Sequence, residues 1–151
     1  MEFLSGLHSK VIHFPIAFFI LYFLFETSGI ILKKDFLAKS AFIVLALGVI
    51  FSVLSVLTGN QAFEVVKASL QKNGLTSLIE RHEQLATVTL WYFFFMLISR
   101  TYLTVKKKFE GNIKYAFILF GLIGCVLIYI TGIYGGELVY KYGVGTGLFG
   151  K

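Results

Sequence analysis

The stretch VIHFPIAFFILYFLFETSGIIL, residues 11–32, decides the fold of this chain. A membrane-spanning helix needs about 20 predominantly apolar residues, because the hydrocarbon layer of a bilayer is about 30 Å thick. Only regular helices satisfy their backbone polar groups there. The stretch therefore predicts a transmembrane helix, and Pro15 falls in its first turn, where the missing N–H costs nothing.

Three further apolar stretches follow, at residues 36–58, 85–105 and 113–132. The composition agrees, since 57% of the 151 residues are hydrophobic and only 15% are charged, against roughly 25% charged in a soluble domain. A single cysteine excludes a disulfide scaffold. The sequence predicts an all-α protein, an integral membrane four-helix bundle that forms one domain over residues 1–151.

The longest connection, residues 59–84, contains a segment with apolar side chains at helical spacing. They are Ala62, Phe63, Val66 and Leu70. This spacing predicts a short helix over residues 61–71 that lies in the membrane interface. Ser77 followed by Glu80 matches a capping box, which predicts that the next helix begins near Leu78.

The distribution of charge predicts the orientation in the membrane. The end of the bundle with the two short connections carries eight Lys and Arg residues and three acidic residues, against six and five at the opposite end. Short loops rich in Lys and Arg stay in the cytoplasm. We therefore expect both termini outside. Because the net charge of +6 reports topology, nucleic acid is not an expected partner.

All three histidines belong to the predicted outer end. His13 and His82 lie at similar depth and could face each other across the bundle, as in helix-bundle cofactor sites. His8 lies about 140° from His13 on an ideal helix, so it is not expected at the same centre. The pattern leaves three readings open. These are a b-type haem with His13 and His82 as axial ligands, a zinc or copper site, and structural histidines that hold helix ends.

Small residues line one face of two predicted helices. They are Ala41, Gly48, Ser52, Ser55 and Gly59 on one, and Gly124, Gly132 and Gly136 on the other. Such stripes are typical of close helix packing in lipid. They would equally leave flat space for a macrocycle or a quinone ring.

Glu26 is the only carboxylate inside a predicted span. Intramembrane ionisable groups are energetically expensive, so they suggest a function. Glu26 either reaches the cytoplasmic interface, where Arg100 is the expected partner, or handles protons. No internal repeat is evident in the sequence, and with one intramembrane charge a transporter is disfavoured.

Two motifs at the outer end resemble those of a known family. The chain has LHS at residues 7–9 and IHFPIA at residues 12–17, against Leu-His-Pro and Val-His-Phe-Pro-Ile-Ala. It has GGELVYKYGVG at residues 135–145, against Gly-Gly-x-Leu-Val-Tyr-x-His-Gly-Val-Gly. The family is a group of bacterial predicted membrane proteins, domain of unknown function 2231. The residues that carry the resemblance include Phe14, Pro15, Glu26, Thr58, Gly59, His82, Gly135, Gly136, Leu138, Val139, Tyr140, Gly143 and Gly145.

The resemblance implies a four-helix domain in a bacterial inner membrane and assigns no reaction to the family as a whole. Tyr142 stands where many relatives have histidine. If the family's histidines form two ligand pairs, this chain has lost one member, and only a single His13–His82 pair survives. His8, Arg81 and Tyr142 complete the candidate cofactor-binding set.

The sequence leaves two functions open. The first is a membrane electron-transfer subunit with one haem b near the periplasmic face, without enzymatic activity of its own. It would exchange electrons with quinol and with a periplasmic cytochrome or a larger membrane complex. The second is a non-catalytic integral subunit or scaffold, whose outer-end motifs tie helix ends together and dock a partner protein.

Overall fold

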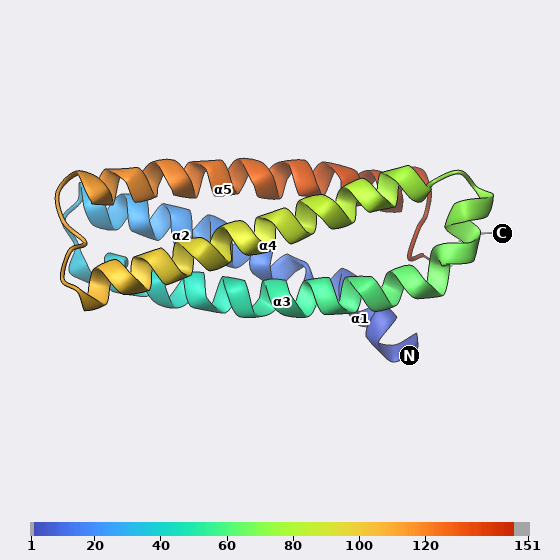
Figure 1. Ribbon diagram of the computed structural model, residues 1–151, viewed down its shortest axis with the longest axis horizontal. Helices are drawn as coiled ribbons and strands as arrows, with labels where there is room; N and C mark the ends of the chain where they lie inside the picture. Colours follow the sequence, from blue (N-terminus) through green and yellow to red (C-terminus); the bar gives the residue numbers. More distant parts are fainter. Residues whose placement is uncertain (1, 147–151) are drawn as a thin grey trace.

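The computed structural model describes residues 2–146, with side chains from residue 6 onward. Its helices are α1 (Glu2–Val11), α2 (His13–Ile31), α3 (Asp35–Lys72), α4 (Thr76–Val105) and α5 (Asn112–Gly136), followed by the short π-helix η1 (Glu137–Lys141). Figure 1 shows α2 to α5 running side by side along the longest axis. Each packs on its neighbours in chain order, and α5 closes the bundle against α2.

The predicted membrane bundle is confirmed. In the described part of the chain, four helical segments are long and apolar enough to cross a membrane. They are Gly6–Ile31, Asp35–Lys72, Thr76–Val105 and Asn112–Lys141. We call the end that holds His8, Thr58, His82 and Gly135 the histidine end. The opposite end, formed by the α2–α3 and α4–α5 connections, is the lysine end. Which side of the membrane each end faces stays a prediction.

Helix boundaries at the histidine end differ from those expected. Residues 61–71 are helical, but they continue α3, whose 38 residues span roughly 57 Å at 1.5 Å per residue. Figure 1 shows the last turns of α3 turning across the end of the bundle. The predicted capping box is wrong, because Leu75 is the N-cap residue of α4 and no side chain caps it.

Pro15 explains why the first span is two helices. Its ring cannot donate to the carbonyl of Val11 and clashes with it, which breaks a helix four residues before the proline. The boundary between α1 and α2 accordingly falls at Ile12. The backbone of Ile12 stays in the right-handed helical region and its N–H donates to the carbonyl of His8 at 3.1 Å, so the two helices together form one spanning segment, Gly6–Ile31.

The bundle contains an internal repeat, so the expectation of none is wrong. Helices α1 to α3 correspond to the α4–α5 hairpin. Residues of α1 and α2 precede their equivalents in α4 by 74 positions, and residues of α3 precede theirs in α5 by 76. The equivalent pairs that make parallel contacts are His8 and His82, Phe19 and Phe93, Gly48 and Gly124, Ser55 and Thr131, and Gly59 and Gly135. Glu26 and Arg100 are also 74 apart and form an ion pair.

The centre of the bundle shows this two-fold relation directly. The rings of Phe19 and Phe93 stack with centroids 3.6 Å apart and planes inclined by 4°. Each ring lies against a glycine of its own hairpin, Phe19 against Gly48 and Phe93 against Gly124. Beside Gly48 and Gly124 the space along the small-residue stripes is therefore filled by phenylalanine rings of the chain itself. This favours close helix packing over space for a macrocycle or a quinone ring as the role of the stripes.

Gly124→Ala should destabilise the bundle, because the added Cβ would lie 2.4 Å from Cζ of Phe93. The ring cannot move away, since Phe19 covers its other face. Overpacking of this kind costs about 1–3 kcal/mol, measurable as a lower midpoint of thermal unfolding in detergent. Gly132→Ala is the matched control on the same helix, because nothing lies within 4 Å of its Cβ position. Equal midpoints for the two variants would contradict the packing described.

Candidate functional site

His8 of α1 is half-buried against α3. Its Nδ1 lies 3.1 Å from the backbone oxygen of Ser55 and 3.3 Å from Oγ1 of Thr58. A carbonyl oxygen can only accept, so Nδ1 carries the proton and donates it to Ser55. A Cβ at Gly59 would lie 3.0 Å from Cε1 of His8, so this glycine lets the ring approach the helix backbone.

His82 of α4 makes the same contacts with α5. Its Nδ1 donates to the backbone oxygen of Thr131 at 3.2 Å, and a Cβ at Gly135 would lie 2.8 Å from its Cε1. The hydroxyl of Thr131 lies 3.2 Å from that of Thr89, which fixes this part of α5 on α4. Both imidazoles are thus held by one backbone carbonyl and one glycine of the adjacent helix.

His82 acts on His8 electrostatically, and among the described residues no hydrogen bond joins the two rings. In each neutral ring the proton is on Nδ1, which leaves Nε2 as an unprotonated nitrogen with a free lone pair. Nδ1–H donation to a backbone carbonyl is the usual arrangement of a metal-ligating histidine. In their neutral forms both histidines of the histidine end therefore carry an unprotonated Nε2.

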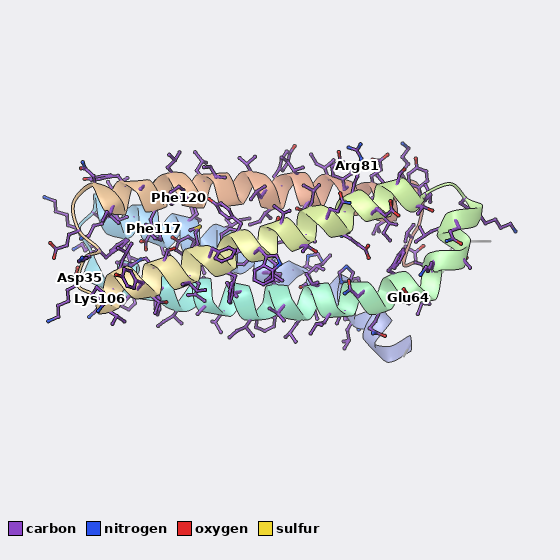
Figure 2. All side chains as sticks on the ribbon, in the orientation of Figure 1. Asp35, Glu64, Arg81, Lys106, Phe117 and Phe120 are labelled. Atoms are coloured by element: carbon purple, nitrogen blue, oxygen red, sulfur yellow. The ribbon has the colours of Figure 1, made fainter. Side chains whose placement is uncertain are left out.

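His13, the expected partner of His82, is exposed in the first turn of α2. The other two residues of the candidate cofactor-binding set, Arg81 and Tyr142, are exposed as well, and Figure 2 shows Arg81 on the outer side of the bundle. Phe14 stacks on Phe51 at the surface, with centroids 4.8 Å apart. The structure does not bring these residues to the imidazole pair.

The GGELVYKYGVG motif, residues 135–145, covers the histidine end of the bundle. Leu138 and Val144 are buried and pack with Leu70, Leu75 and Ile79 of the α3–α4 turn. Gly143 and Gly145 adopt positive φ values of 70° and 78°, which favour glycine. Val139 and Tyr140 are exposed, and a Cβ added at Gly136 would lie 3.8 Å from the Tyr140 ring. Much of this motif therefore has a structural role.

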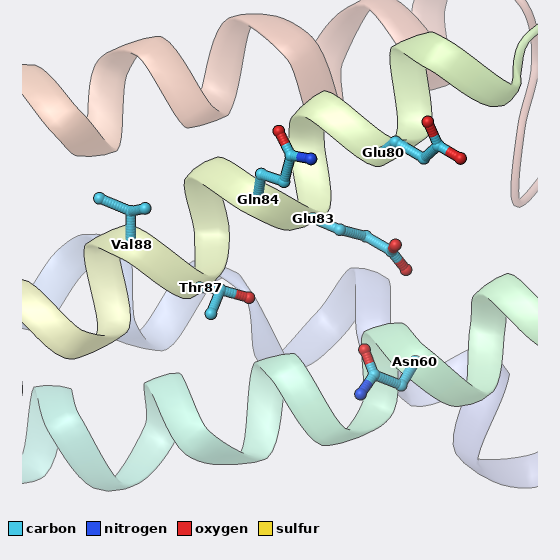
Figure 3. A pocket seen from close by; sticks show the side chains of 6 residues that line it. All are labelled: Asn60, Glu80, Glu83, Gln84, Thr87 and Val88. Carbon is cyan, nitrogen blue, oxygen red and sulfur yellow. The ribbon is translucent and has the colours of Figure 1, made fainter.

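A pocket of about 390 Å³ opens between α3 and α4 at the histidine end. Figure 3 shows Glu83 of α4 pointing toward Asn60 of α3 across it, with Glu80 nearby. Despite these carboxylates, the described residues contain no group of three or more His, Cys, Asp or Glu placed to hold a metal ion. A zinc or copper ion would lack ligands beyond the two imidazoles, so the site does not fit a lone ion.

Glu26 is buried near the lysine end and pairs with Arg100, the partner expected from the sequence. The Nε of Arg100 lies 3.1 Å from Oε1 of Glu26, and its Nη1 donates to Oγ1 of Thr104 at 2.6 Å. The guanidinium also lies 3.3 Å from the centre of the Phe109 ring, a cation–π contact. Oε2 of Glu26 has no partner among the described residues, and proton handling by this group stays a prediction.

A comparison with protein-family models agrees with these observations. The model of a family described as predicted membrane protein, DUF2231, matches residues 5–147. The chain belongs to this family. Comparisons with curated proteins and with solved structures gave no match. Family membership thus shows a membrane protein, with the lipid bilayer as its surroundings, and assigns it no reaction.

Sequence reasoning named His8 as a candidate but did not recognise that it is equivalent to His82, and it missed the carbonyls of Ser55 and Thr131 that orient the two rings. A signal for this equivalence was present. In both halves the histidine precedes a phenylalanine by 11 residues, and that phenylalanine precedes a charged residue by seven. A search for this spacing of histidine, phenylalanine and charged residue would have found the equivalence, whereas a search for similar sequence in the two halves would not.

Arg100→Leu should destabilise the protein by about 3–5 kcal/mol, because it leaves the buried Glu26 carboxylate unpaired. Glu26→Leu together with Arg100→Leu should recover most of this loss, since neither charge then remains. Chemical unfolding in detergent would measure both. The control is a substitution of Lys141 that breaks its exposed ion pair with Glu137. It should lower the free energy of unfolding by less than about 1 kcal/mol. If the double variant lost as much stability as the two single substitutions together, Glu26 and Arg100 would not be coupled.

Proposed function

We propose that this protein is a membrane electron-transfer subunit that binds one b-type haem between His8 and His82. The observation that carries the proposal is the two-fold arrangement of these imidazoles, each held through Nδ1 by a carbonyl of the adjacent helix. Bis-imidazole ligation needs two Nε2 atoms that face each other. In this proposal His8 and His82 at the histidine end supply them.

The donor set supports haem over other metal centres. A lone ion needs three or four ligands from the protein, whereas haem iron has four nitrogens from its macrocycle and needs only two axial ligands. The glycines beside the imidazoles lead to the same conclusion. Gly59 and Gly135 let both rings sit close to the helix backbone, so the ring planes are fixed by packing before any ligand binds.

The residues of the site would orient and tune the group rather than react. Haem would supply reversible one-electron transfer when bound. The carbonyls of Ser55 and Thr131 keep the proton on Nδ1, and this hydrogen bond makes Nε2 a stronger donor to a metal. Leu138 and Val144 close the histidine end against solvent, which would stabilise the less charged form of a redox centre.

The proposal extends to the surroundings of the site. We place the protein in a bacterial inner membrane with the histidine end on the periplasmic side, where a periplasmic cytochrome or a larger complex could accept electrons. Quinol is the expected donor in lipid. The competing function is a non-catalytic subunit, in which His8 and His82 serve only as hydrogen-bonded links between helices.

The absorbance spectrum of the purified protein tests the proposal. Expressed with sufficient haem, the protein should show a Soret band and a reducible α-band, and His8→Ala or His82→Ala should abolish them by removing one axial ligand. His13→Ala is the matched control and should keep the spectrum, because its side chain is exposed.

Two results would overturn this assignment. A folded, colourless protein would leave the non-catalytic subunit as the function. A spectrum lost in His13→Ala but kept in His8→Ala would restore the His13–His82 pair. Thermal unfolding of each variant distinguishes the loss of a ligand from the loss of the fold.

The proposed orientation has a separate test. Alkaline phosphatase is active only in the periplasm, so its fusion after Lys151 should be active, and its fusion within the α4–α5 connection should be inactive. The physical reason is the excess of Lys and Arg in the short connections of the lysine end. Activity in the opposite pattern would reverse the assignment of the two ends.

A further inference from the structure

A second pocket, of about 800 Å³, lies at the lysine end between the α2–α3 and α4–α5 connections. Figure 2 shows Asp35 and Lys106 in these two connections at the same end of the bundle. The Glu26–Arg100 pair borders the pocket through Arg100. The pocket is far along the bundle from the histidines, and the proposed function does not use it.

The lining of this pocket carries an excess of positive charge. Besides Arg100 it includes four lysines and two acidic residues, Asp35 and Glu110. The lysines are Lys33, Lys39, Lys107 and Lys114. None of the four forms an ion pair with a carboxylate of the described residues. Lys114 lies 6.0 Å from the centre of the Phe109 ring and acts on Glu26, so Lys33, Lys39 and Lys107 are the lysines best placed to bind an anion.

Two of these lysines occupy a strained backbone conformation. Lys33 and Lys107 have φ values of 52° and 54°, in the left-handed region that lysine rarely adopts. Each follows the last turn of its helix, where glycine is the usual residue. The next residue, Lys34 or Lys108, donates its N–H to the carbonyl of Gly29 or Leu103. The two turns are equivalent in the internal repeat, and both present a lysine to the same pocket.

The other walls of the pocket are apolar and open toward lipid. Ile43 and Tyr115 line it and are 59% and 61% exposed on the outer surface of α3 and α5. Phe42 and Ile30 add further apolar surface. A ligand of this site would hold a negative charge beside the lysines and apolar groups along the helices. A small soluble anion would contact the lysines but not the apolar walls.

We propose that this pocket binds the headgroup of an anionic phospholipid, with the phosphate beside Lys33 and Lys107. Basic pockets between transmembrane helices recognise such headgroups, and a volume of about 800 Å³ falls in the range of ligand sites. The pocket lies beside the Glu26–Arg100 pair, so a bound lipid joins the two hairpins at the end where their connections are shortest.

Native mass spectrometry of the detergent-purified protein measures this binding. Phosphatidylglycerol and phosphatidylcholine with the same acyl chains are the probes, and we expect tighter binding of phosphatidylglycerol. Lys33→Gly with Lys107→Gly removes both charges and relieves both strained turns, so the variant should stay folded. Its affinity for phosphatidylglycerol should fall roughly tenfold or more, while phosphatidylcholine binding should stay the same.

Lys67→Gln with Lys72→Gln is the matched control, because these lysines lie near the histidine end, and it should keep the affinity. Equal affinity for the two lipids, or an unchanged affinity in the double glycine variant, would overturn the proposal. Displacement of phosphatidylglycerol by millimolar inorganic phosphate would also overturn it, since it would identify a soluble phosphate compound as the ligand.

Discussion

The stack of Phe19 on Phe93 is the contact on which the rest of the bundle depends. The two rings come from diagonally opposed helices, α2 and α4, and each rests on a glycine of the helix beside it. Because both phenylalanines occupy the same position in their hairpins, the stack fixes the register of one hairpin on the other. Seven residues away in one direction Glu26 then meets Arg100, and 11 residues away in the other His8 and His82 occupy equivalent positions.

This register explains which residues the two ends can tolerate. Equivalent residues meet near a two-fold axis, so identical charges there would repel strongly in a medium of low dielectric constant. At position 26 and its equivalent the chain has opposite charges, Glu26 and Arg100, which attract. At position 8 and its equivalent it has two histidines, which can meet when both are neutral. A neutral imidazole is also the form that binds a metal, and a proton on Nδ1 leaves Nε2 as the nitrogen that can do so.

The sequence predicted the four spans because the bilayer fixes the length and polarity of a transmembrane helix. It also predicted Arg100 as the partner of Glu26, since a charge in lipid needs one. It chose His13 rather than His8 for the bundle site, because the sequence does not show which face of this helix turns toward α3; the predicted angular separation of the two holds, since His8 is half-buried and His13 is exposed. Helix ends were less predictable, because tertiary packing of Leu70 and Leu75 decides where α3 and α4 stop.

The absence of a repeat was one reason to disfavour a transporter, and the structure contains a repeat. The composition of the core gives a different reason. Transporters with repeats bind their substrate near the midplane, where polar groups line a passage. Here the midplane between the histidine end and the Glu26–Arg100 pair is filled by Phe19, Phe93 and the apolar side chains around them. Stacked rings separate the two polar ends, and the described residues of this core line no polar route for an ion or solute. An electron needs no such route, and a lipid-facing headgroup pocket does not cross the core. The same core therefore fits a redox subunit or a scaffold with separate sites at its two ends.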